Sequence, residues 1–282
     1  MRKTTTILGL LVAAVLLSAC ATGKGGAGPV VSAADKPLPP GTVHRTHRKH
    51  RIARSHRKYA SRASRRKTAC KVRKNVVEWS LIRGACRNGY AYGKGYARSA
   101  DGRRSYHGGF VAGEFSGKGD YDWGNGTRYR GDFRHGDKSG LGTISYRNGS
   151  HYEGGFRDNV YNGHGTYFGA DGSRYVGGFR DGQFSGQGVY RWPNGDRYMG
   201  DFRKDVMAGH GTLTRSNGEK YTGNFADNKM SGEGVYTWPN GDRYEGEFRD
   251  NKMNGHGVYR NADGSSYTGD FRNGKKVNES QR

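Results

Sequence analysis

A repeat of 23 residues dominates the sequence. Eight tyrosines follow one another at this interval, and each has glycine two positions later and phenylalanine four positions later. They are Tyr106, Tyr129, Tyr152, Tyr175, Tyr198, Tyr221, Tyr244 and Tyr267. No insertion breaks the interval between the first and the last of them. A fixed period of this length indicates one small structural unit that is stacked many times along the chain.

Each repeat unit predicts a β-hairpin. Its Tyr-x-Gly-x-Phe segment alternates with a period of two, so the two rings share one face of a strand. A second strand with the pattern Gly-x-Gly-x-Tyr-x-Trp follows, for example at residues 186–192. Seven units then carry Asn-Gly or Asp-Gly, as at Asn194-Gly195. We expect a type I′ turn there, because this dipeptide tolerates positive φ. The other connection, such as residues 249–254, is polar and rich in turn-forming residues.

Successive hairpins of this kind predict an all-β fold, an elongated single antiparallel β-meander. The composition agrees, because only 32% of the 282 residues are hydrophobic and 49 are glycine. That excludes a thick, leucine-rich core, and with it most α/β enzyme folds. Glycine normally weakens a strand, so we expect the Tyr and Phe rings to lie flat over the glycine backbone in place of a second layer. The rings are therefore predicted to form the core and not a ligand platform.

The pattern Tyr-x-Gly-x-Phe…Gly-x-Gly…Asn-Gly resembles the MORN repeat over residues 106–274. Residues 76–105 look like a degenerate unit without the leading tyrosine and are predicted to cap the array, and residues 275–282 form a C-terminal tail. The resemblance implies a membrane-associating or protein-binding scaffold. Catalytic activities found beside such arrays would belong to a separate domain. The chain has no Ser-His-Asp, P-loop or paired-carboxylate pattern, so no enzyme, catalytic residue or cofactor is expected.

Residues 1–19 predict a lipoprotein signal peptide. Two basic residues precede an uninterrupted apolar run over residues 7–17, which is shorter than the roughly 20 residues of a membrane span. The run leads into Leu-Ser-Ala-Cys, which resembles the lipobox of bacterial lipoproteins and implies acylation of Cys20. Ala21 follows that cysteine in place of Asp, which implies the outer membrane, facing the periplasm, within the bacterial cell envelope. The alternative is an ordinary signal peptide with a chance cysteine.

Residues 20–75 predict a disordered basic linker. From residue 21 on, this stretch holds 16 basic residues against one acid, and so carries most of the net charge of +23. Few apolar residues offset the entropy of ordering it. We expect anionic lipid or a wall polymer, and no nucleic acid, to bind its cations, and a solvated spacer is the alternative. The cations are Arg45, Arg48, Lys49, Arg51, Arg54, Arg57, Lys58, Arg62, Arg65, Arg66 and Lys67.

Cys70 and Cys86 remain once Cys20 is acylated. An exported protein occupies an oxidising compartment, so this even remainder predicts one disulfide that staples the linker to the first unit. Two free thiols are the alternative. Three histidines over residues 44–50 have a spacing that could ligate a metal. The arginines and lysines between them repel cations, so no metal site is expected.

Two functions remain open at this point. The first is a lipid-anchored cell-envelope scaffold that binds a protein or a membrane through the sheet. The second is a polyanion or glycan binder that uses the basic linker and exposed aromatic residues. The two differ in salt dependence, because binding through the linker weakens steeply as ionic strength rises.

Overall fold

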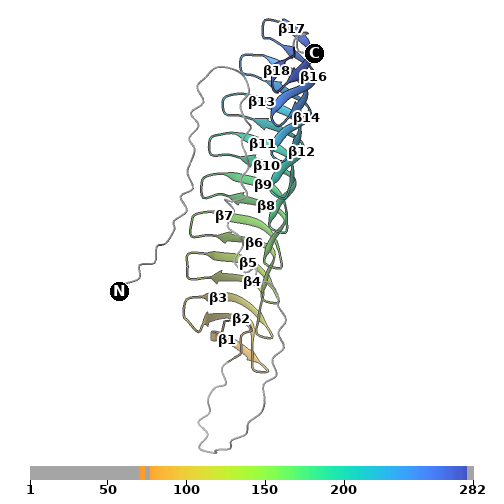
Figure 1. Ribbon diagram of the computed structural model, residues 1–282. Coiled ribbons are helices and arrows are strands. Elements are labelled where there is room, and N and C mark those ends of the chain that lie inside the picture. Colours follow the sequence, from red (N-terminus) through yellow and green to blue (C-terminus); the bar gives the residue numbers. More distant parts are fainter. Residues whose placement is uncertain (1–69, 74–76, 278–282) are drawn as a thin grey trace, which may run out of the picture.

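The described part of the chain forms a single open β-sheet, long and narrow (Figure 1). The computed structural model describes residues 70–73 and 77–277. Each strand pairs antiparallel with the next one along the chain, so the predicted all-β meander is confirmed. The strands are β1 (Trp79–Arg87), β2 (Tyr90–Ser99), β3 (Ser105–Val111), β4 (Glu114–Asp122), β5 (Arg128–Arg134), β6 (Asp137–Ser145), β7 (His151–Arg157), β8 (Val160–Phe168), β9 (Arg174–Arg180), β10 (Gln183–Arg191), β11 (Arg197–Arg203), β12 (Val206–Thr214), β13 (Lys220–Ala226), β14 (Lys229–Thr237), β15 (Arg243–Arg249), β16 (Lys252–Arg260), β17 (Ser266–Arg272) and β18 (Lys275–Lys276).

Each repeat unit bends at a glycine in its second strand. In the β9–β10 pair, Phe184 opposes Phe179. Gly188 opposes Gly177, so the three residues of β10 between Phe184 and Gly188 lie opposite a single residue of β9, Gly178. The middle one of the three is a glycine with a φ of 72°. Extra residues on one strand bend that strand and increase its twist. Figure 1 shows the hairpins turning a corner along one side of the array. The face that carries the buried Tyr and Phe rings is called the inward face below.

The inward face holds an aromatic core that continues from unit to unit. The Tyr175 ring stacks on Phe184 of its own unit, with 3.7 Å between ring centroids. It also meets Phe202 of the next unit edge-on at 5.0 Å, which joins the two units. Edge-on pairs of this kind are worth roughly 0.5–1.5 kcal/mol beyond the area they bury. The core is therefore a chain of nearest-neighbour contacts with no second layer.

The rings lie flat on glycine, which confirms the expectation from sequence. A Cβ atom on Gly188 would come within 2.5 Å of Cε2 of Tyr175, so no other residue fits there without moving the ring. The Tyr175 hydroxyl extends across this backbone and donates a hydrogen bond to the carbonyl of Gly178 at 2.9 Å. Seven of the eight repeat tyrosines are at most 1% exposed, while Tyr267 in the last unit is only partly buried.

The turns differ from the expectation. At Asn194-Gly195 only the glycine has positive φ, at 92°, so this is not a type I′ turn. The Gly195 amide donates to the carbonyl of Trp192 at 3.0 Å, the pattern of a type I turn followed by a left-handed glycine. The Asn194 side chain instead accepts a hydrogen bond from the Asp196 amide at 3.1 Å. Type I′ geometry occurs in the other connection, where Asp227 and Asn228 have φ of 47° and 66°.

The hairpin β1–β2 caps the array at its N-terminal end. Gly93 opposes Phe110 and Ala97 opposes Tyr106, so β2 holds the place of the second strand of a unit. Cys86 opposes Ala91 just as a repeat phenylalanine opposes the residue five positions after it, so β1 holds the place of the first strand. This region therefore forms a whole hairpin in register with the array, although it lacks the ring-bearing residues of a repeat.

Candidate binding surface

The side chains between the core residues point to the opposite, outer face of the sheet. There they meet across strands in one continuous line, because each pairs with its equivalent on both neighbours; for example, Val189 opposes Val176 and Met199. We call this line the outer row. Its members are Tyr96, His107, Asp120, Arg130, Thr143, Glu153, Thr166, Val176, Val189, Met199, Thr212, Thr222, Val235, Glu245, Val258 and Thr268.

A groove of about 1380 Å³ runs along the outer face from β2 to β9. Its floor is the backbone of the glycines that the core tyrosines cover from the other side, such as Gly142 and Gly165. One wall is the N-terminal half of the outer row. Lys118, Leu141 and His164 contribute to the other wall. The same glycines thus serve two purposes: they admit the ring on the inside and leave a hollow on the outside.

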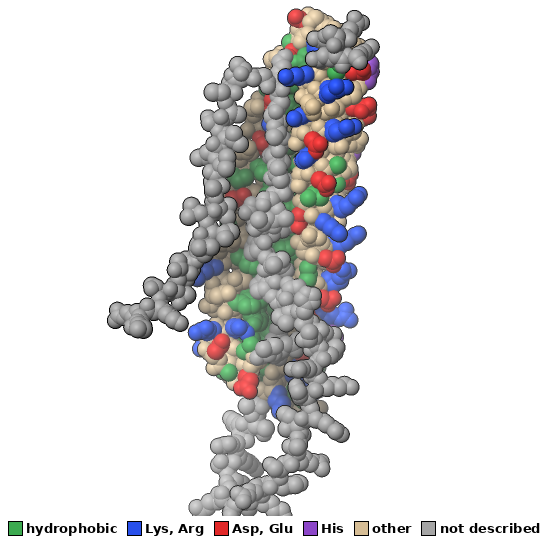
Figure 2. All heavy atoms as spheres, viewed as in Figure 1, with side chains coloured by type: hydrophobic (Ala, Val, Ile, Leu, Met, Phe, Trp, Pro, Cys, Tyr) green, Lys and Arg blue, Asp and Glu red, His purple; other side chains and the backbone are tan. Residues whose placement is uncertain are grey.

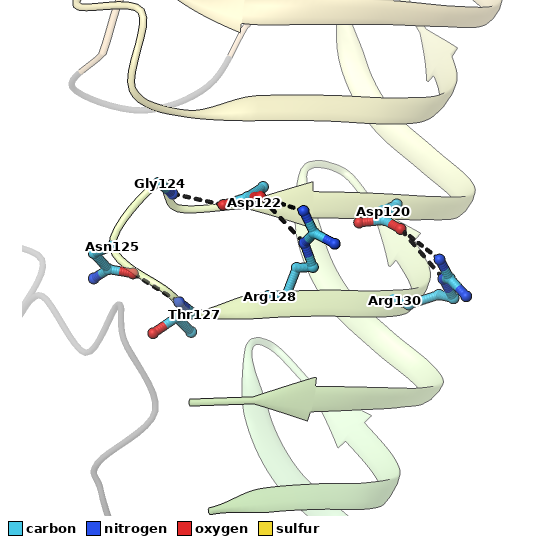
Figure 3. Close-up of polar contacts among 7 residues, drawn as sticks. All are labelled: Asp120, Asp122, Gly124, Asn125, Thr127, Arg128 and Arg130. Carbon is cyan, nitrogen blue, oxygen red and sulfur yellow. Dashed lines mark hydrogen bonds and ion pairs between the residues drawn. The ribbon is translucent and has the colours of Figure 1, made fainter. Parts of the chain in front are cut away.

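Charged residues in the first two repeat units are paired with one another (Figure 3). Arg130 bonds Asp120 at 2.9 Å, and Arg128 bonds Asp122 at 2.8 Å. A hydrogen bond from the Gly124 amide, followed by the Arg128 pair, holds the pKa of Asp122 below its ordinary value. Exposed pairs of this kind fix side-chain positions but contribute little to stability.

From Thr166 to Val235 the outer row carries no charge over seven consecutive strands. Val176 and Met199 are 39% and 45% exposed there, although most of the surface of this protein is polar. In the view of Figure 2, Lys and Arg side chains are interspersed with Asp and Glu down one edge of the array. Four of these seven residues are Val or Met and three are Thr, and we call this uncharged stretch the apolar strip. An exposed apolar stretch of this kind is typical of a surface that contacts another macromolecule.

The inner tyrosines are unsuited to proton transfer at neutral pH. Burial raises the pKa of Tyr121 and of Tyr244 to about 12. Burial also raises the pKa of Tyr161 far above its ordinary value, and the nearby Tyr146 hydroxyl adds to the shift. These hydroxyls stay protonated at neutral pH. That of Tyr244 donates a hydrogen bond to the Glu247 carbonyl at 3.1 Å and that of Tyr161 bonds the Tyr146 hydroxyl, so their role is structural.

One inner position carries a cation that sequence reasoning missed. Lys138 is 2% exposed, at a place where six other units have Phe, Tyr or Met and the truncated last unit has the exposed Lys276. Its ammonium lies 5.3 Å from the ring centre of Trp123 and 5.8 Å from that of Tyr129. Aromatic faces attract such a cation. A lysine at a position that is Phe or Tyr in the neighbouring units is the sequence signal that could have revealed this buried cation.

The structure describes only some of the predicted site residues. Cys20 and all eleven cations predicted to bind a polyanion lie outside the described residues. Cys70 and Cys86 form a disulfide, with their Cα atoms 5.7 Å apart. Across residues 70–73 and 77–277, no three His, Cys, Asp or Glu side chains gather closely enough to hold a metal ion. The same residues include no helix that could span a membrane.

A second cavity, of about 500 Å³, opens beside the start of the groove. Sequence reasoning did not single out its residues, which are Arg83, Lys94, Gly95, Tyr96 and His107. Two of them, Lys94 and His107, also line the groove, so the two hollows adjoin.

The MORN repeat family model matches eight consecutive segments, residues 106–128, 129–151, 152–174, 175–197, 198–220, 221–243, 244–266 and 267–277. These segments make up more than half of the chain and coincide with the hairpins of the array. The chain is a MORN-repeat protein. Its MORN array begins at the first core tyrosine and ends beside β18. No curated protein matches the chain.

Two solved structures are distantly similar to the MORN array in shape. One is the TCP domain of Drosophila melanogaster SAS-4 (dCPAP) in complex with a proline-rich motif of Ana2 (dSTIL), with 14% identity over 54% of this chain and 83% of that chain and a TM-score of 0.34. The other is the wild-type TCP10 domain of Danio rerio CPAP, with 12% identity over 62% and 89% and a TM-score of 0.28. Likeness at this level carries no information about what the present chain binds.

Proposed function

We propose that this MORN-repeat protein is a lipid-anchored scaffold of the bacterial cell envelope that holds a protein partner against the outer face of its array. MORN repeats are associated with protein or membrane binding, and the finer assignment rests on this chain's own residues. The leader and Cys20 support an acyl anchor, and Ala21 supports the outer membrane. Binding without catalysis agrees with a regular array that disperses its polar groups along the sheet.

The observation that carries the proposal is the contrast between the two faces. The inner positions repeat the same rings in unit after unit, because they form the core. The outer row varies, with Arg130, Glu153, Val176 and Met199 at equivalent places in four consecutive units. A surface whose chemistry changes along its length fits one partner in one register. A repetitive polymer would instead meet a different side chain at every step.

A charge introduced into the apolar strip tests this use of the outer face. Met199→Asp places a carboxylate in its middle, and Ser145→Asp adds the same charge at an exposed site on β6 outside the outer row. We expect proteins captured from envelope extract by the full chain to be lost with Met199→Asp and retained with Ser145→Asp. The Arg197 guanidinium lies 3.5 Å from the Met199 sulfur and can pair with the new carboxylate, but burying a charge pair in an interface still costs several kcal/mol, or roughly a hundredfold in affinity. Equal capture by both variants would contradict the scaffold assignment.

The polyanion alternative is supported by the charge of residues 44–67. Deleting this segment separates the two functions. If the scaffold proposal holds, capture through the array survives both the deletion and a rise in salt. Retention on anionic lipid or wall polymer that requires residues 44–67 and falls steeply with salt would favour the alternative.

The anchor is tested separately. Cys20→Ser should abolish metabolic labelling with palmitate and release the protein from washed membranes, because the thioether to the diacylglycerol can no longer form. Persistent labelling of the variant would overturn the lipobox assignment and leave the sheet proposal intact.

A further inference from the structure

The cavity beside the start of the groove is lined by two cations, Arg83 and Lys94, and by a histidine, His107, together with the Tyr96 hydroxyphenyl ring. Both Arg83 and Lys94 are exposed, and neither makes an ion pair within residues 70–73 and 77–277. The neighbouring acid, Asp120, lies opposite His107 but bonds Arg130 at 2.9 Å on its other side. Within the part of the chain that the structure describes, the positive charge of the cavity is therefore not neutralised.

The repeat supplies an internal comparison for Lys94. Lys94 and Lys118 hold the same place in successive hairpins, since each follows the glycine that opposes a core phenylalanine on the next strand. Lys118 faces Asp132 across the strands and bonds it at 2.9 Å. Lys94 faces Gly109, which offers no side chain. Two lysines in equivalent backbone positions thus differ in one respect, the presence of a carboxylate, and the one without it lines the cavity.

A β-bulge brings Arg83 to the same side of the sheet. Leu81 opposes Ala97, and without an irregularity Ile82 would oppose Tyr96 and point to the outer face. The register instead shifts by one residue, so Arg83 opposes Tyr96 in its place. Bulges of this kind redirect a side chain and are common beside functional sites. This bulge has no equivalent in the array, where the register shifts fall at the bend.

We propose that this cavity binds the phosphate group of a phosphate ester, with Arg83, Lys94 and His107 as its anion-binding residues. A guanidinium fork, an ammonium and an imidazole present more donors than the two oxygens of a carboxylate can use, whereas a phosphate has three or four acceptor oxygens. About 500 Å³ is the size of a small-molecule site and exceeds what a bare ion needs. The organic part of the ester then extends into the adjoining groove. This inference does not depend on the scaffold role proposed above.

Calorimetric titration of the full chain with glycerol 3-phosphate, at constant pH and salt, tests the site. Arg83→Gln and Lys94→Gln should each raise the dissociation constant roughly tenfold or more, because each removes a charge-assisted hydrogen bond. Arg83→Lys should recover part of the loss, since it restores the charge without the fork. Arg98→Gln removes another exposed cation of β2, one that lines neither hollow, so it is the control and should change the constant by less than about twofold. All of these side chains are exposed, and an unchanged circular dichroism spectrum and melting temperature would establish that the variants fold.

The titrations distinguish a soluble phosphate ester from a lipid headgroup as the ligand, and they include results that would overturn the proposal. Parallel titrations use phosphatidylcholine vesicles with and without phosphatidic acid. The same ranking of variants with the soluble ester assigns the site to a free ligand, and that ranking with phosphatidic acid vesicles alone assigns it to a lipid headgroup. Equal weakening by Arg83→Gln, Lys94→Gln and Arg98→Gln would show a diffuse charge effect and overturn the proposal. Failure of every phosphate probe to bind, or binding that no variant affects, would overturn it as well.

Discussion

The capping hairpin β1–β2 and the MORN repeats after it share one backbone register but are stabilised differently. In the repeats, rings at the inner positions contact the rings of the next unit, as Tyr175 contacts Phe202. In the cap, the equivalent inner positions hold Ala91 and Ala97, which are fully buried but carry no rings. A disulfide and the edge-on packing of Trp79 on Phe115 at 5.3 Å close this end instead.

This difference follows from position in a linear array. An internal unit has a neighbour on both sides, so repetition alone buries its rings. A terminal unit has one neighbour and must be closed by other means. The difference extends to the surface. Several charges of the first repeats are paired, whereas Arg83 and Lys94, the cap cations that line the second cavity, have no ion pair among the described residues. The cap thus departs from the repeat in its interior, its covalent bonds and its electrostatics at once.

The largest expected effect comes from blocking the ring-on-glycine contact inside the array. Gly165→Val puts a branched side chain where even a Cβ would lie 2.5 Å from Cε2 of Tyr152. We expect a loss of about 3 kcal/mol or more in the free energy of unfolding, measured by urea denaturation. Gly149→Asn is the control, because this turn glycine has open space around its Cβ direction and asparagine tolerates its left-handed φ. Similar losses for both variants would refute the packing explanation.

Removing the Cys70–Cys86 disulfide should destabilise the cap alone. In a variant with both Cys70→Ala and Cys86→Ala, the 16-residue separation no longer closes a loop, which costs roughly 3 kcal/mol by the chain-entropy relation. Hydrogen exchange of the β2 amides should accelerate, while the amides of β10–β15 keep their protection because contacts are between neighbours. Uniform acceleration along the sheet would mean that the cap and the array unfold as one unit.

Tyr90 of the cap should ionise at a lower pH than the buried tyrosines of the array. Hydrogen bonding and positive charge from Arg73 lower the pKa of Tyr90 in the cap, whereas burial raises that of Tyr244 in the array to about 12. A raised folded-state pKa contributes stability that is complete below the unfolded value near 10 and is lost as pH rises toward the folded one. We therefore expect the array to weaken between about pH 10 and 12.

Ultraviolet absorbance follows the ionisation of these tyrosines, and Tyr90→Phe identifies the early step. This variant should remove absorbance change below pH 10 and leave the later, cooperative step in place. Loss of the late step in this variant would contradict the assignment.

The smallest effect is expected from surface charges. Arg130→Gln breaks the pair with Asp120 (Figure 3) and should cost no more than about 0.5 kcal/mol in thermal or urea unfolding. Arg98→Gln on β2 in the cap, where no acid is paired with Arg98 in the described residues, should leave stability unchanged. A cost above about 1 kcal/mol at Arg130 would mean that the paired charges of the first repeats support the sheet and do not merely fix its surface.

Much of the fold could be predicted because the repeat is regular. The interval between tyrosines gives the hairpin unit. The glycine two positions after each tyrosine, and the one thirteen positions after it in the first seven units, give the ring-on-backbone packing. The prediction of a type I′ turn at Asn194-Gly195 was wrong, because a side-chain hydrogen bond stabilises a different turn there. The bend in β10 was not predicted either, since it depends on three residues of β10 lying opposite one residue of β9.

The candidate sites were less accessible to sequence reasoning. The predicted anchor Cys20 and the cations of residues 44–67 follow from local composition, and they lie outside the described residues. The cavity at Arg83 and Lys94 has no local motif, because its residues come from three strands and from a shift in register.

The sequence by itself determined the unit, its period, the rings that form the core and the glycines that admit them, because each is a short-range pattern that every unit repeats. Tertiary structure decided which side chains face outward together, which cations meet a carboxylate and where the sheet is hollow. Those properties depend on cross-strand register, and in the cap a single extra residue in one strand is enough to change which side chains meet.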